Sequence, residues 1–196
     1  MLNYHTGLSA LWTWACSEGY ALKNLLHEIE RPRPEKRLIQ PFSESDIRAM
    51  LGALARSKPY IDRGTTTSHT LPNQDRNRAI ILLLLDTGLR AEELCSARVA
   101  DLDLKNQYLK VFGKGDRERI LPFCSRTAQV LWKYLAARGS HPTEQLFLTE
   151  DRTPMDRHRL LKQLTAIGRR AGITGVHPHR FRHTITINRF SRHSRR

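Results

Sequence analysis

Four basic side chains of this 196-residue chain could act together on one chemical group. Arg90 stands at a predicted helix start, Lys114 occupies a GKG turn, and His179 and Arg182 are three residues apart, which places them on one helix face. Arginines can clamp phosphate oxygens through paired N–H donors, a lysine can protonate a leaving oxygen, and a histidine can bind the phosphate or move a proton. With no carboxylate pair beside it, this set predicts chemistry on a phosphate, where positioning and charge stabilisation matter most.

The same histidines leave a metal site open as a second interpretation. His177, His179 and His183 fall within one short stretch, and histidines four apart can share a metal ion. No Cys, Asp or Glu nearby offers a clear third ligand, so we expect no metal. The chain also lacks a GxxxxGK(S/T) loop, so we do not expect the phosphate of a nucleoside triphosphate, and we expect no cofactor.

The net charge indicates a polyanionic partner. Lys and Arg number 33 against 19 Asp and Glu, which gives a formal charge of +14 and a pI near 10.4. Such an excess is typical of nucleic-acid binding. An anionic membrane is the alternative, but the most apolar stretch, AIILLLLDTG, is too short to span a bilayer, so we expect no membrane partner. Three cysteines without CxxC spacing indicate buried thiols in a reducing compartment, and we expect the cytoplasm.

The chain divides into three predicted parts. Residues 1–30 are predicted to be helical with a break at Gly19, and they are too short to close a core, so we expect a partial helical domain. Trp12 belongs to its apolar face, which favours core packing over stacking on bases. Residues 31–41 form a basic linker that could follow a phosphate backbone or act as a solvated spacer. Residues 42–196 form the larger domain.

The larger domain is predicted to be α+β and mainly helical. A helix start opens it, with Ser43 as N-cap and Asp46 three residues later. The Thr- and Ser-rich stretch 57–75 is predicted to be a long loop. Short strands around a glycine-containing turn are expected over 101–123, as one small antiparallel sheet. Helices are expected over 77–86, 89–97, 126–137 and 156–171, with a last one from about residue 178.

Three segments, in order, resemble the markers of the tyrosine recombinase (phage integrase) family: TGLRAEEL, VFGKGDRERILPF and HPHRFRHT. LSALWTWACSEGYALKN is similar to the last helices of that family's DNA-clamping core-binding domain, and PFSESDIRAML to the entry of its catalytic domain. The resemblance covers nearly the whole chain. It implies a catalytic domain that cleaves and rejoins duplex DNA through a 3′-phosphotyrosyl link, preceded by a partial core-binding domain.

The resemblance also implies roles for single residues. In the family, two clamping arginines contact the scissile phosphate, and Arg90 and Arg182 match them. The hairpin lysine that protonates the leaving 5′ oxygen matches Lys114, and the histidine of the HxxR motif matches His179. Glu93 matches a carboxylate that supports an arginine, and His183 is a second supporting residue. Further DNA contacts are expected from the linker, the hairpin and the last helix, at Arg31, Arg33, Lys36, Arg37, Arg117, Arg119 and Arg180.

Plain structural interpretations stay open for some of these features. Arg90 could form only a surface salt bridge with Glu93, and Lys114 could be a solvated turn lysine. The terminal run RFSRHSRR is either a DNA-contacting tail or a frayed end.

The chain departs from the family pattern after Thr184. All five tyrosines precede the HxxR segment, so no nucleophile is identified, and we expect a recombinase truncated at both ends and inactive alone. A full-length recombinase partner could supply the tyrosine in trans. The alternative function is a non-catalytic DNA-binding regulator or decoy of such a recombinase. An RNA-binding protein is a third hypothesis, disfavoured because the chain has no RNP-like aromatic strand.

Overall fold

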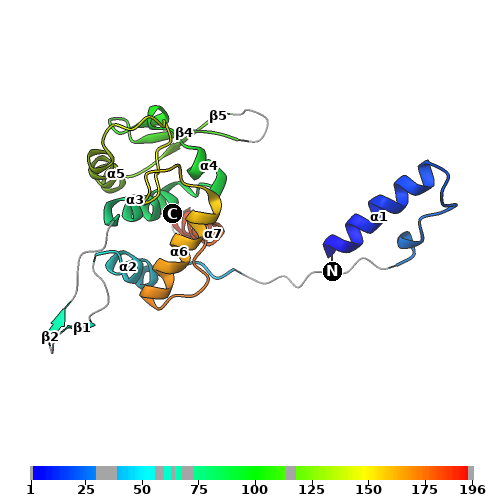
Figure 1. Ribbon diagram of the computed structural model, residues 1–196, viewed down its shortest axis with the longest axis horizontal. Coiled ribbons are helices and arrows are strands. Elements are labelled where there is room, and N and C mark those ends of the chain that lie inside the picture. The colour runs from blue at the N-terminus through cyan, green and yellow to red at the C-terminus, as the bar shows by residue number, and fades with distance from the viewer. Residues whose placement is uncertain are drawn as a thin grey trace. The chain divides into compact units, whose positions relative to one another are not determined.

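The chain folds as two units. The computed structural model describes residues 2–29, 39–55, 60–62, 65–67, 73–113 and 118–193. Contacts within the chain separate residues 1–38 from residues 39–196 (Figure 1). Every described residue that is buried belongs to the second unit.

The first unit is one helix followed by a short 3₁₀ turn. Helix α1 spans Leu2–Ser17 and η1 spans Leu25–His27. Asn24 joins them, because its side-chain oxygen accepts a hydrogen bond from the second residue of η1 at 3.0 Å and its amide donates to the Ser9 carbonyl at 3.0 Å. The expected return to α-helix after Gly19 is therefore wrong, since Asn24 satisfies the backbone locally as a cap.

The apolar face of α1 is only partly covered by its own unit. Trp12 is half-buried and its indole N–H donates to the Lys23 carbonyl at 3.1 Å, which favours packing over base stacking. Leu8 and Leu11 remain 49% and 56% exposed. The described part of this unit therefore closes no core, as its length predicts.

Helices dominate the second unit. They are α2 (Glu44–Gly52), α3 (Gln74–Thr87), α4 (Ala91–Ser96), α5 (Ser125–Arg138), α6 (Arg157–Ala171) and α7 (Pro178–His193). The predicted start of α2 is confirmed as a capping box, in which Ser43 and Asp46 exchange hydrogen bonds of 3.1 and 3.0 Å. Across the described ranges, none of the helices is both long and apolar enough to cross a membrane.

Helix α3 lies at the centre of the core. Ile80, Ile81, Leu83 and Leu84 point to different sides of it, yet each is less than 2% exposed. A helix that is apolar all round must be covered all round. Helices α5 and α7 pack against α3, while α6 packs against α2 and α4.

The second unit also contains a small three-stranded sheet. Its strands β3 (Leu102–Asp103), β4 (Tyr108–Phe112) and β5 (Glu118–Pro122) are antiparallel in the order β3-β4-β5. Leu109 pairs with Leu121 and is fully buried, so one face of the sheet joins the core. The prediction of a mainly helical α+β domain with a small antiparallel sheet is confirmed.

The long loop predicted over 57–75 contains a hairpin instead. Strands β1 (Tyr60–Asp62) and β2 (Thr65–Thr67) pair antiparallel, with Tyr60 opposite Thr67. The polar composition did not indicate this hairpin, because threonine is β-branched and suits a strand as well as it suits a surface loop. Residues 56–59, 63–64 and 68–72 lie outside the described part.

Two smaller expectations also change. Helix α7 continues to His193, so most of the run RFSRHSRR is helical rather than frayed. The three cysteines are free thiols, but the expected burial is wrong for Cys124, which is exposed as the N-cap residue of α5. Burial raises the pKa of Cys95 to about 11, so this thiol stays protonated at neutral pH.

Candidate phosphate-binding site

Gly88 ends α3 and shapes the turn that carries Arg90. Its φ of +64° lies in the left-handed region, and its N–H donates to the Leu84 carbonyl at 3.0 Å. Arg90 is the N-cap residue of α4. Its backbone N–H donates to Glu93 Oε2 and its guanidinium to Glu93 Oε1, both at 2.9 Å. The side chain of Arg90 is still 53% exposed, so the rest of the guanidinium can meet a ligand.

Glu93 is the buried counter-charge of this turn. Its side chain is 6% exposed, and it also accepts a hydrogen bond from Arg119 on β5. Burial raises the pKa of Glu93, but the hydrogen bonds from Arg90 and the charges of Arg119 and Arg90 outweigh burial and hold the pKa below its usual value. Arg90 thus does form a salt bridge, but with a buried and ionised partner that orients it.

Helix α7 crosses α3 closely at Gly88. A Cβ atom on Gly88 would lie 3.3 Å from Ile185 Cδ1 and 3.6 Å from Arg182 Cγ, so the approach of α7 depends on a glycine here. Arg182 Nη1 donates to the Gly88 carbonyl at 2.9 Å. Arg182 is thereby anchored beside the turn that carries Arg90.

Three of the four basic residues singled out in the sequence meet in one shallow depression. The α3–α4 turn and the start of α7 form it, through Leu89, Arg90, Ala91, Pro178, His179 and Arg182. None of these lining residues is acidic, and His179 is exposed. Two guanidiniums and an imidazole around an apolar floor can hold a tetrahedral oxyanion such as a phosphate.

The fourth residue, Lys114, lies outside the described residues. The strands on either side of it are described, and they end at Phe112 and begin again at Glu118. The other predicted DNA contacts outside the described residues are Arg31, Arg33, Lys36, Arg37 and Arg117.

Two predicted residues of α7 do not join the depression. His183 is exposed and is not among its lining residues. The side chain of Arg180 is only 16% exposed, and its Nε and Nη1 donate to the carbonyls of Gln40 and Thr174 at 2.8 and 2.6 Å. The structure therefore gives Arg180 intramolecular contacts, and its contact with DNA stays a prediction.

Two contributors to the site were missed in the sequence. Gly88 lies between two expected helices, and the sequence does not show its close contact with α7, which involves residues far along the chain. Arg119 was expected only as a DNA contact, which stays a prediction, and the structure adds its ion pair with Glu93. The signal in the sequence is the two-residue period of a strand, which puts Arg119 on the same face as the apolar Leu121, the partner of the buried Leu109.

One histidine at the start of α7, His177, caps the helix. His177 Nδ1 accepts a hydrogen bond from the Arg180 N–H at 3.3 Å. Burial lowers the pKa of His177, and the neighbouring charges of His179, Arg180 and His183 lower it further. Within the described ranges, no group of three His, Cys, Asp or Glu side chains could hold a metal ion.

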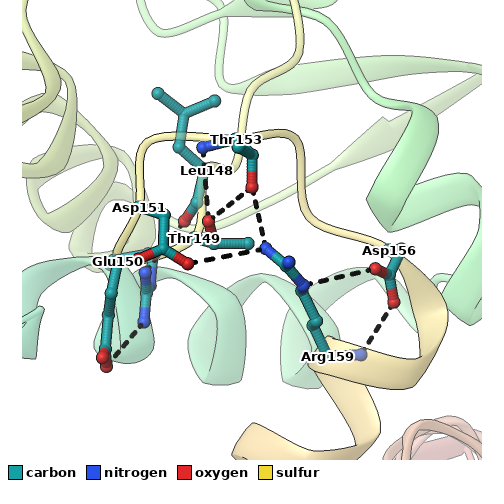
Figure 2. Close-up of polar contacts among 8 residues, drawn as sticks. Leu148, Thr149, Glu150, Asp151, Thr153, Asp156 and Arg159 are labelled. Atoms are coloured by element: carbon teal, nitrogen blue, oxygen red, sulfur yellow. Dashed lines mark hydrogen bonds and ion pairs between the residues drawn. The ribbon is translucent and has the colours of Figure 1, made fainter.

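A second polar cluster at the start of α6 shares no lining residue with the depression. Figure 2 shows Arg159 directed at Thr153 and Asp151, with Asp156 beside it. Arg159 donates to Thr153 Oγ1 at 2.8 Å, and the Asp156 carboxylate accepts from the Arg159 N–H at 2.8 Å. These groups satisfy one another and cap α6, so we assign the cluster a structural role.

Known sequences resemble this chain along most of its length. Residues 60–189, more than half of the chain, match the sequence model of the phage integrase family. The tyrosine recombinase XerC of Lactobacillus leichmannii is 29% identical over 164 residues, which cover 80% of this chain and 51% of that protein. The chain thus spans about half the length of this relative.

Solved structures share the fold. The crystal structure of XerA recombinase superposes with a TM-score of 0.65 at 25% identity, over 93% of this chain and 60% of that one. The Tn1549 transposon integrase, solved in complex with transposon right end DNA, superposes with a TM-score of 0.73 at 19% identity, over 96% of this chain and 65% of that one.

Proposed function

Because the chain belongs to the phage integrase family, we propose that its depression binds a backbone phosphate of duplex DNA during site-specific recombination. The observation that carries the proposal is the convergence of Arg90, His179 and Arg182 from two elements that lie far apart in the chain. The formal charge of +14 supports a polyanionic partner. Free thiols support the cytoplasm as the compartment of this proposal.

Each residue has a role in the proposed chemistry. Arg90 and Arg182 hold the non-bridging oxygens, and Glu93 holds Arg90 in place. Attack by a tyrosine oxygen forms a new bond to phosphorus and breaks the bond to the 5′ oxygen. In this step Lys114 protonates the leaving oxygen, and His179 is the candidate to bind the phosphate or accept the proton of the tyrosine. His183 is proposed only as a support outside the depression.

The proposed domain organisation follows the same family pattern. Residues 42–196 act as the catalytic domain, residues 1–30 as part of a core-binding domain, and residues 31–41 as the linker, whose cations contact DNA. The separation of the chain into units at residues 38 and 39 supports this division.

The attacking tyrosine is proposed to come from outside these 196 residues. Among the described side chains, Tyr134 is buried, donates its hydroxyl to the Leu146 carbonyl at 3.1 Å and accepts from the Leu148 N–H at 3.1 Å, so it is a packing residue. The described lining of the depression contains no tyrosine. A full-length recombinase is the proposed partner that supplies one.

The phosphate-binding role is tested by titrating labelled duplex DNA at several salt concentrations. Each lost phosphate contact should weaken binding and reduce the slope of log K against log salt by roughly 0.9. We expect this for Arg182→Ala with little change in melting temperature, and for Arg90→Ala together with a lower melting temperature, because that variant removes a partner of the buried Glu93 carboxylate. The matched control is Arg48→Ala, since Arg48 is a 74% exposed arginine of α2 paired with Glu44. If the depression variants and the control bind alike, the depression is not the phosphate site.

The partner is tested by complementation. A full-length relative that keeps its tyrosine but lacks its own clamping arginine is mixed with this chain on a recombination site. Covalent DNA–protein product above that of the relative alone would support a clamp supplied by this chain. If the chain instead only slows an intact relative, it acts as the regulator or decoy. If it does neither, the partner proposal fails.

A further inference from the structure

We infer that Arg180 is a positioning residue, which couples the segment that enters the second unit to the phosphate-binding depression. The inference rests on the function proposed for that depression. It concerns the residues Gln40 and Phe42, which we call the entry segment, and the face of α7 that lies against them.

Arg180 holds three parts of the fold together. Its Nε donates to the Gln40 carbonyl at 2.8 Å, and its Nη1 donates to the Thr174 carbonyl, in the α6–α7 connection, at 2.6 Å. Its guanidinium carbon lies 4.2 Å from the centroid of the Phe42 ring, and its Nη2 lies 4.0 Å from Asp46 Oδ2. A planar guanidinium can make these contacts at once because its donors form a fixed fork and its face can stack.

Phe42 reinforces the same joint. Its N–H donates to Thr184 Oγ1 at 2.9 Å, and its ring centroid lies 4.7 Å from that of Phe181. Thr184 also donates to the Arg180 carbonyl at 2.8 Å, and it is 1% exposed. The entry segment is thus fixed to α7 by backbone, ring and guanidinium contacts.

The other face of the same helical turn carries the depression. Successive helix residues are rotated by about 100°, so Arg182 points about 200° around α7 from Arg180. Arg182 reaches the Gly88 carbonyl, where the helices leave no room for a Cβ atom without adjustment. Because the residues of one helical turn are tied together by backbone hydrogen bonds, a displaced entry segment would shift His179 and Arg182 relative to Arg90. The position of the entry segment can therefore act on the clamp through Arg180.

The test replaces Arg180 with lysine. Arg180→Lys keeps the positive charge that a direct DNA contact needs, but it loses the fork that reaches two carbonyls and stacks on Phe42. We expect DNA binding to weaken by roughly the same factor as in Arg182→Ala, on the order of tenfold, with the same loss of salt slope. In the Arg182→Ala background, Arg180→Lys should weaken binding by a smaller factor than in the wild type, because part of its effect passes through Arg182. The matched control is Arg48→Lys.

Several results would overturn the inference. One is an Arg180→Lys variant that binds DNA like the wild type. Another is an effect that adds fully to that of Arg182→Ala, which would make Arg180 an independent DNA contact. If Arg180→Lys does not fold, Thr184→Val serves instead, since it removes the hydroxyl bonded to Phe42 at nearly constant shape.

A readout without DNA separates this inference from the proposed function. The imidazole NMR signals of His179 report the local position of α7, and they should move in Arg180→Lys but not in Arg48→Lys. Unmoved His179 signals would overturn the inference whatever the DNA titrations give. If Arg182→Ala binds DNA normally while Arg180→Lys moves His179, the proposed function fails and the positioning role stands.

Discussion

Arg119 on β5 forms an ion pair with Glu93 in α4, although 26 positions separate them in the chain. The pair attaches the β4–β5 hairpin to the turn that carries Arg90. Lys114 lies between β4 and β5 in the sequence, so the same pair also fixes the strand that follows Lys114. Glu93 therefore organises two parts of the candidate site rather than one arginine.

Replacing Glu93 with glutamine should destabilise the protein. The variant removes the negative charge of a buried side chain that pairs with both Arg90 and Arg119, so we expect a loss of about 1–3 kcal/mol in the free energy of unfolding. Urea denaturation at neutral pH measures it. The control is Glu92→Gln, because Glu92 is 70% exposed and its pair with Arg157 should contribute less than about 1 kcal/mol. Equal losses in the two variants would contradict the organising role of Glu93.

The acid stability of the protein should also depend on Glu93. Its pKa is lowered from 4.5 in the folded state, so its contribution is fully present above about pH 4.5 and is lost as the pH falls through the folded pKa. The fall in unfolding free energy below pH 4.5 should therefore be shallower in Glu93→Gln than in the wild type. Parallel curves from denaturation at a series of pH values would rule this out.

A methyl group at Gly88 should weaken both the fold and DNA binding. Gly88→Ala strains a left-handed residue and presses on Ile185 and Arg182, so we expect a loss of about 1–3 kcal/mol. Gly172→Ala is the matched control, since Gly172 is also a left-handed helix end but has nothing within 4 Å of a new Cβ atom. Only Gly88→Ala should alter the DNA titration, and a similar change in Gly172→Ala would refute the link to α7.

The His177 cap should make α7 sensitive to pH. The pKa of His177 is lowered from 6.5, so the protein is most stable above that pH and loses stability as the pH falls toward the folded pKa. His177→Asn keeps a good capping residue that does not titrate, so its stability should fall less over the same interval. Thermal melting from neutral to mildly acidic pH tests this, with exposed His158→Asn expected to behave like the wild type. A wild-type curve that stays flat there would exclude the cap as a titrating group.

Asp86 should stabilise α5 from the end of another helix. Its Oδ2 accepts hydrogen bonds from the Cys124 N–H at 2.9 Å and from Thr127 Oγ1 at 2.7 Å. Asp86→Ala removes this cap and should lower the free energy of unfolding by about 1–2 kcal/mol. Asp86→Asn retains an acceptor and should lose less. DNA binding should not change in either variant once folded, and a selective binding defect would contradict the capping role.

Much of the fold was readable in the sequence because its signals are local. The capping residues Ser43 and Asp46 act over one helical turn, and the apolar run of α3 shows its burial in its own composition. The hairpin β1–β2 was missed because threonines suit a loop and a strand equally, and pairing with a neighbouring strand decides between them. In the first unit, Asn24 capped a short turn where helix propensity favoured a longer helix.

The residue types available for phosphate chemistry follow from the sequence, which also predicts Arg90 at a helix start and His179 and Arg182 on one helix face. Lys114 stays a prediction. What each cation touches depends on how the distant segments pack. Arg180 stands beside the HxxR positions, yet its guanidinium lies against a carbonyl 140 positions away, and Arg119 lies against a buried carboxylate. An arginine has the same charge and reach in every local pattern. Its partner is chosen by which distant backbone or side-chain groups the packed core brings within hydrogen-bonding distance, and that choice is a property of the whole fold.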